Sequence, residues 1–145
     1  MTDVKVTKVM ERVLGGKRTA DSLLGAHEQV QSGLSKKDAN EFFNHEPPVR
    51  GLFTYRQLRQ AVIPDSTWKK AHDTLSPELS EKVARIVRLM GMALDALEDE
   101  AWALEWMLRP HPELGNHIPA TLLKTESGGR AVEGVLAKLL YGLPV

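Results

Sequence analysis

The sequence predicts an all-α fold, and three observations support this prediction. Apolar residues recur three and four positions apart along most of the chain, which is the period of a helix with one buried face. Strand signals are weak, because β-branched residues are scattered and alternation of apolar and polar residues is short-lived. Helix-capping residues, glycines and prolines separate the apolar runs, which divides the chain into about seven or eight helices.

Composition indicates a cytoplasmic protein with one ordinary domain or two very small ones. The 145 residues include 42% hydrophobic residues, enough to bury a core. The absence of cysteine excludes disulfides, thiol catalysis and cysteine-ligated zinc, and is typical of a reducing compartment. No apolar run reaches the roughly 18 residues of a membrane span. The N-terminus "MTDVKVTKVM" lacks the apolar segment of a secretory signal, so we expect no membrane association.

Three short helices are expected before residue 45. The first ends at Gly15-Gly16 and the second at Gly33. Ser35 can cap the third, which runs to Phe43 before Pro47-Pro48 interrupts the chain. The apolar stripes are Val6, Val9, Met10 and Val13 in the first helix, and Leu23, Leu24, His27 and Val30 in the second.

The stretch "TYRQLRQAVIPDSTWKKAHDTL", residues 54–75, predicts two short helices joined by a tight turn. Thr54 can cap the first, and Ile63-Pro64 ends it because proline disfavours helix in the preceding residue. Asp65 or Ser66 can cap the second, with Trp68 facing inward. This arrangement is a candidate helix-turn-helix.

The second of these helices has residues suited to DNA recognition. Ser66 and Thr67 can hydrogen-bond to base edges, and Lys69 and Lys70 can bind phosphates. Residues 50–70 contain five basic residues and one acidic residue, which is compatible with a phosphate-facing surface. Spacing alone leaves two alternatives open, namely a purely structural helix pair and an ordinary solvated basic face.

The clearest helix begins with Ser76 as N-cap and Pro77 at the first helical position. Its apolar period continues to Leu104, and a kink is expected near 98–100, where "LEDEA" forms an acidic cluster that we expect to be solvated. Apolar residues occupy more than one of its faces. We therefore expect one face in the core and another in a homodimer contact. The additional apolar residues are Val87, Leu89 and Met92.

The last third predicts a proline-rich loop followed by two helices. Pro110 and Pro112 end the preceding helix, and Pro119 opens a short one. Thr125 or Ser127 can cap the final helix, which ends at Gly142. Its apolar residues are expected on one side: Val132, Val135, Leu136, Leu139 and Leu140. An apolar "LPV" tail follows the glycine.

No residue pattern indicates catalysis, a cofactor or a metal. None of the five histidines has a partner at helical metal-ligand spacing, and no glycine-rich phosphate loop or serine nucleophile elbow occurs. His111, Glu113 and His117 share one loop, and the acidic "LEDEA" could bind calcium or magnesium, but solvation explains both more simply. Trp102 and Trp106 are neighbours on one helix face, for which packing is the simpler explanation.

The C-terminal third contains a run of residues whose combined spacing is far more specific than any single motif above: Trp106, Pro110, Pro112, Leu114, Gly115, Pro119, Leu122, Leu123, Thr125, Gly128, Val132, Leu136, Tyr141 and Gly142. Over about residues 100–145 this run resembles the toxin-binding domain of Xre/MbcA/ParS antitoxins. Residues 20–100 are compatible with the divergent Xre-like helix-turn-helix region of the same family. One departure is "RPHPEL", where family members more often have asparagine before the second proline and a second glycine after Gly115.

The resemblance implies three segments: an N-terminal extension at 1–19, a helix-turn-helix DNA-binding and dimerisation region at 20–97, and a toxin-binding domain at 98–145. The implied protein is an antitoxin without enzymatic activity. It would bind a RES-domain toxin that consumes NAD⁺ or uses it to ADP-ribosylate a target. It would also bind the promoter of its own operon as a homodimer, and form a larger complex with the toxin.

The resemblance also suggests a role for the tail. Tyr141, Leu143, Pro144 and Val145 would form a plug that enters the toxin's active-site cleft, with Lys138 adding a contact at its rim. The alternative for the tail is that it folds back on its own helix. The alternative for the whole chain is a solitary helix-turn-helix transcriptional regulator whose C-terminal module binds a different protein.

Overall fold

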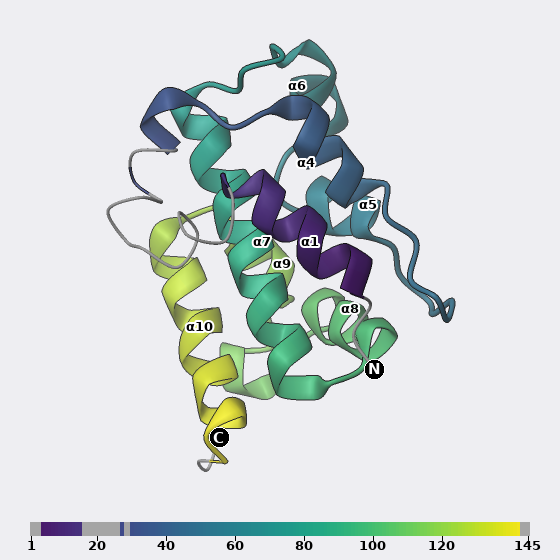
Figure 1. Ribbon diagram of the computed structural model, residues 1–145. Helices are drawn as coiled ribbons and strands as arrows, with labels where there is room; N and C mark the ends of the chain where they lie inside the picture. The colour runs from purple at the N-terminus through teal and green to yellow at the C-terminus, as the bar shows by residue number, and fades with distance from the viewer. Residues whose placement is uncertain (1–3, 16–26, 28–29, 143–145) are drawn as a thin grey trace.

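The computed structural model describes residues 4–15, 27 and 30–142 (Figure 1). Apart from two isolated bridges, Ser35 with Thr74 and His111 with His117, these residues form helices and loops, which confirms the predicted all-α class. The elements are α1 (Val4–Val13), α4 (Lys36–Phe43), α5 (Tyr55–Gln60), α6 (Asp65–Lys70), α7 (Pro77–Leu97), α8 (Glu100–Leu108), the 3-10 helix η1 (Pro112–Leu114), α9 (Pro119–Leu122) and α10 (Glu126–Leu140).

Side-chain caps set the start of several helices, as predicted. Ser35 accepts a hydrogen bond from the backbone N–H of Asp38 at the start of α4, and Ser76 and Thr125 cap α7 and α10 in the same way. Thr54 forms a capping box at α5, in which its hydroxyl and the side chain of Gln57 each accept a backbone N–H. The cap predicted for α6 is wrong, because Pro64 occupies the N-cap and neither Asp65 nor Ser66 caps the helix.

Helix α7 is the centre of the fold, and α1, α8 and α10 all pack against it (Figure 1). Val87 and Leu89, two of the additional apolar residues, are buried within the single chain. Met92, the third of these residues, is half-buried. The homodimer contact itself stays a prediction. The helix is apolar on several sides because several helices of its own chain cover it.

The predicted kink after α7 is a complete break between two helices. Glu98 adopts a left-handed backbone conformation with φ 58°, which ends α7. Asp99 then caps α8 by accepting the backbone N–H of Trp102 at 2.8 Å. The next residue, Glu100, begins a helix that packs back onto α7.

Helix α1 belongs to the same core as the helices that follow. Its predicted stripe of Val6, Val9, Met10 and Val13 is buried. The division into segments 1–19, 20–97 and 98–145 stays a prediction. Leu23, Leu24 and the tail residues 143–145 lie outside the described residues. Within the described ranges, no helix combines the length and apolarity needed to cross a membrane.

Candidate functional site

The turn between α5 and α6 is braced from inside by Arg59. This buried side chain donates from Nη1 to the carbonyl oxygen of Ile63 at 2.8 Å and pairs through Nη2 with the carboxylate of Asp65. Its guanidinium also lies 5.8 Å from the ring centre of Trp68. One of the five basic residues counted in 50–70 is therefore structural and not available to a phosphate.

Asp65, the only acidic residue in 50–70, forms an ion pair with Arg59. Hydrogen bonds from Arg59 and then Gln60 lower the pKa of the Asp65 carboxyl below its ordinary value of 3.8. Asp65 thus remains ionised and paired at the start of α6. The negative charge that it brings to this face is offset by a neighbouring cation.

Trp68 fixes α6 to the body of the protein. Its ring is buried edge-to-face against Phe43 at 5.5 Å, and its Nε1 donates to the side-chain oxygen of Asn40 at 2.8 Å. The inward orientation predicted for Trp68 is therefore confirmed. Both contacts are made with α4, so the opposite side of α6 faces away from the core.

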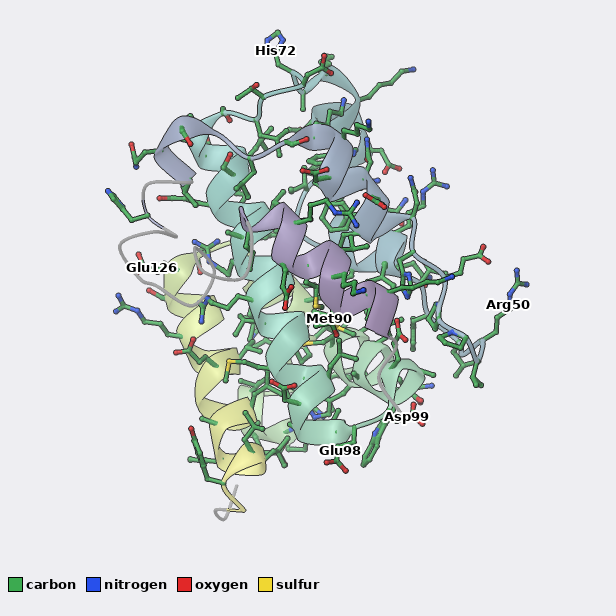
Figure 2. The ribbon with its side chains drawn as sticks, viewed as in Figure 1. Arg50, His72, Met90, Glu98, Asp99 and Glu126 are labelled. Atoms are coloured by element: carbon green, nitrogen blue, oxygen red, sulfur yellow. The ribbon has the colours of Figure 1, made fainter. Side chains whose placement is uncertain are left out.

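The four residues predicted to contact DNA lie on that outward side. Each of them is exposed, and α6 lies at one end of the molecule, where Figure 2 shows His72 projecting into solvent two residues after the helix ends. Small hydroxyl groups and cations thus share an accessible surface, as a recognition helix requires. Their contacts with DNA remain a prediction. The four residues are Ser66, Thr67, Lys69 and Lys70.

A buried carboxyl group joins the helix-turn-helix to the C-terminal helices. Glu100 at the start of α8 accepts a 2.6 Å hydrogen bond from the hydroxyl of Tyr55, and the Nε2 of His45 lies 2.9 Å from the same Oε1. Its other oxygen, Oε2, is buried and has no hydrogen-bond partner among the described residues. The expectation of a solvated acidic cluster is wrong for Glu100, and its partners, 45 and 55 residues away, gave no signal in the sequence.

The C-terminal helix packs closely against its neighbours at its start. A Cβ on Gly128 would lie 2.0 Å from the backbone oxygen of Leu122, and a Cβ on Gly129 would lie 2.8 Å from the side chain of Arg85. Figure 2 shows Glu126, the first residue of α10, at the end of α10 opposite the C-terminus. The two glycines therefore allow α10 to approach α9 and α7.

The other end of α10 presents apolar and basic side chains to solvent. Lys138 is exposed, Tyr141 is 77% exposed, and Leu140 points outward, contrary to its expected place on the buried side. Gly142 has φ 66° and donates its backbone N–H to Leu139, so it ends the helix as predicted. This end lies far from α6 (Figure 1). The other predicted contact residues, Leu143, Pro144 and Val145, lie outside the described residues.

Of the two loop histidines, only the His111 side chain takes a structural role, and His117 is exposed. His111 and His117 form a backbone bridge, and the His111 ring stacks on Trp106 with 4.6 Å between ring centres. No cluster of three potential metal ligands occurs among the residues that the structure describes. Trp106 is half-buried, whereas Trp102 is 53% exposed, so packing does not account for Trp102 as expected.

Comparison with known proteins gives two domain matches that follow one another along the chain. Residues 25–88 match the antitoxin Xre-like helix-turn-helix domain, and residues 92–142 match the antitoxin Xre/MbcA/ParS C-terminal toxin-binding domain. The first match ends at residue 88 and the second begins at residue 92, both within α7. Glu100 therefore lies in the second matched domain.

Two curated relatives both bear the name Antitoxin Xre. The protein from Yersinia enterocolitica is 38% identical over 90 residues, which is 59% of this chain and 61% of that relative. The protein from Photorhabdus laumondii is 37% identical over 65 residues, which is 44% of each chain. The chain thus spans less than two thirds of the length of either relative.

Proposed function

Since the chain belongs to the Xre/MbcA/ParS antitoxins by both of its matched domains, we propose that it is the antitoxin of a type II toxin–antitoxin pair. It acts by binding, as a toxin inhibitor and as a repressor of its own operon, and not as an enzyme. The observation that carries the proposal is the separation of two accessible surfaces. The polar side of α6 and the apolar end of α10 lie at opposite ends of the molecule (Figure 1), so toxin and DNA can be bound together.

The toxin that we propose as partner carries a RES domain that consumes NAD⁺ or uses it for ADP-ribosylation. The choice of this toxin class rests on the family resemblance of residues 100–145. Tyr141 supports a binding role for the end of α10, because an aromatic side chain this exposed supplies a large contact area when a partner covers it. Lys138 on the same last turn adds a charged contact at the rim.

The tail Leu143–Val145 completes the toxin contact in this proposal. Burial of its apolar side chains stabilises the complex by about 25 cal/mol per Å² of apolar surface removed from water. Pro144 reduces the conformational entropy lost when the tail is fixed.

The DNA-binding half represses the operon. Ser66 and Thr67 read base edges from the major groove, and Lys69 and Lys70 bind phosphates. A homodimer would place two copies of α6 on half-sites separated by about 34 Å, one turn of DNA.

Co-expression with the neighbouring reading frame tests the proposal. A tagged chain should copurify with a RES-type toxin, and cells that produce both proteins should retain their NAD⁺ while cells with the toxin alone lose it. Specific promoter binding without any toxin complex would instead support the solitary regulator. NAD⁺ turnover by the purified chain alone would contradict a purely binding role.

A further inference from the structure

We propose that residues 46–53, which we name the Arg50 loop, form a second DNA-contacting element that inserts Arg50 into the minor groove flanking the operator. This inference rests on the proposed DNA binding by α6 and adds a contact that the helix-turn-helix itself does not supply. The loop connects α4 to α5 and leads directly into the first helix of the pair. Figure 2 shows Arg50 extending away from the body of the protein.

The position of the loop fits helix-turn-helix docking. In that docking the second helix lies in the major groove and the first crosses the sugar–phosphate backbone. The segment that enters α5 therefore stands beside the backbone. Helix α5 spans about 9 Å, and the residues from Arg50 to Thr54 add at most about 14 Å. Together, the helix and the loop segment are long enough for Arg50 to reach across the half-turn of about 17 Å that separates a major groove from the adjacent minor groove.

The side chains of the loop have the chemistry of a minor-groove element. The Arg50 side chain is 86% exposed, and its described ion pair is a 3.9 Å contact with Glu46, which is also exposed. Because such a surface ion pair is weak, Arg50 can exchange it for a contact with a phosphate or a base edge. A planar, weakly hydrated guanidinium is favoured by the negative potential of a narrow minor groove. Val49 and Leu52, 73% and 72% exposed, flank it and can contact sugars or wedge between bases.

Contacts with α8 hold the base of the loop in place. Glu100 fixes both ends, through His45 before the loop and Tyr55 after it. Gly51 lies so close to α8 that an added Cβ would be 3.0 Å from the Cβ of Ala101.

A further contact supports the loop near its end. The guanidinium of Arg109 lies 5.5 Å from the ring centre of Phe53. The tip is thus presented from a fixed base, which limits the conformational entropy lost when it binds.

The test is a fluorescence-anisotropy titration of the full chain against its own promoter duplex with three sets of flanking base pairs: A·T, G·C and inosine·cytosine. Inosine·cytosine keeps the major-groove groups of G·C but lacks the minor-groove amino group. The wild-type chain should bind A·T and inosine·cytosine flanks alike, and both about tenfold more tightly than G·C flanks. Arg50→Ala should lose this preference and reduce the salt slope by about one.

Arg130→Ala is the matched control, because Arg130 is also an exposed arginine paired with a glutamate four residues away on its own segment. It should bind every duplex as the wild-type chain does. Equal wild-type affinity for all three flanks, with Arg50→Ala indistinguishable from wild type while Lys69→Ala weakens binding, would overturn the loop proposal and leave the proposed function intact. Absence of promoter binding by a folded wild-type chain would overturn both. Loss of dimer or toxin copurification in Arg50→Ala, with unchanged DNA binding, would reassign the loop to a protein contact.

Discussion

The hydroxyl of Tyr55 donates a 2.6 Å hydrogen bond to Oε1 of Glu100, and both side chains are buried. Tyr55 is the first residue of α5 in the helix-turn-helix, and Glu100 is the first residue of α8 in the C-terminal region. The bond therefore joins the starts of two helices that belong to different matched domains. Displacement of either helix would disturb the other through this contact.

Tyr55→Phe should lower the free energy of unfolding by about 1–2 kcal/mol, because the buried Glu100 loses a hydrogen-bond donor while its carboxyl group stays out of water. Urea denaturation measures this difference. Tyr141→Phe removes the same hydroxyl from an exposed ring and should leave stability unchanged. Equal stability of Tyr55→Phe and the wild-type chain would mean that the bond contributes nothing to folding.

Gly128→Ala should destabilise the protein by about 2 kcal/mol or more, because the added Cβ would overlap the backbone oxygen of Leu122 and force α10 away from α9. Gly134→Ala is the matched change in the same helix. No atom lies within 4 Å of a Cβ added there, so alanine should stabilise the helix by about 0.5–1 kcal/mol. Thermal unfolding of both variants checks the opposite signs, and a shared sign would contradict the packing described for α10.

Acid should weaken the turn between α5 and α6 through Asp65. Hydrogen bonds from Arg59 lower the pKa of Asp65 in the folded chain below 3.8, so its contribution to stability is present above that value. The contribution is lost as the pH falls through the lowered pKa. Urea denaturation between about pH 5 and pH 2.5 should show a larger loss of stability for wild type than for Asp65→Asn. Asp73→Asn, a change at an exposed loop carboxyl, should follow the wild-type curve.

Lys69→Ala and Lys70→Ala should each weaken promoter binding and reduce its salt slope by about one, because each removes one phosphate contact. Ser66→Ala and Thr67→Ala should instead change the preference among operator sequences. Anisotropy titrations over a range of salt concentrations separate the two effects. Lys124→Ala removes an exposed lysine from the C-terminal region and serves as the control. An unchanged salt slope in both lysine variants would contradict the assignment of α6 as the recognition helix.

Local chemistry explains which parts of this structure the sequence could predict. The caps at Ser35, Thr54, Ser76 and Thr125 depend on residues within the next three positions, so they can be predicted from the sequence. The outward face of α6 can also be predicted from the sequence, because the single buried residue Trp68 determines which side of this short helix faces the core.

Residues whose roles depend on distant partners could not be assigned in this way. The sequence places Arg59 among the basic residues of a predicted phosphate-facing surface, although its side chain is buried against the turn between α5 and α6. The sequence predicts a solvated Glu100, because nothing near it in the chain reveals its partners Tyr55 and His45. An apolar residue such as Val87 or Leu89 can be buried within one chain or between two chains, and the sequence does not distinguish these cases; in the structure both are buried within the chain.

In the proposed function, the end of α10 and the tail that follows it inhibit a toxin. The most direct measurement titrates the chain into purified RES-type toxin and follows NAD⁺ consumption, with the full chain compared to a chain that ends at Gly142. The full chain should stop NAD⁺ consumption at a fixed molar ratio. The truncated chain should unfold at the same urea concentration but require at least tenfold more protein, a factor equivalent to about 1.4 kcal/mol. Equal inhibition by the two chains would contradict the role of Leu143–Val145, and no inhibition by the full chain would contradict the antitoxin function itself.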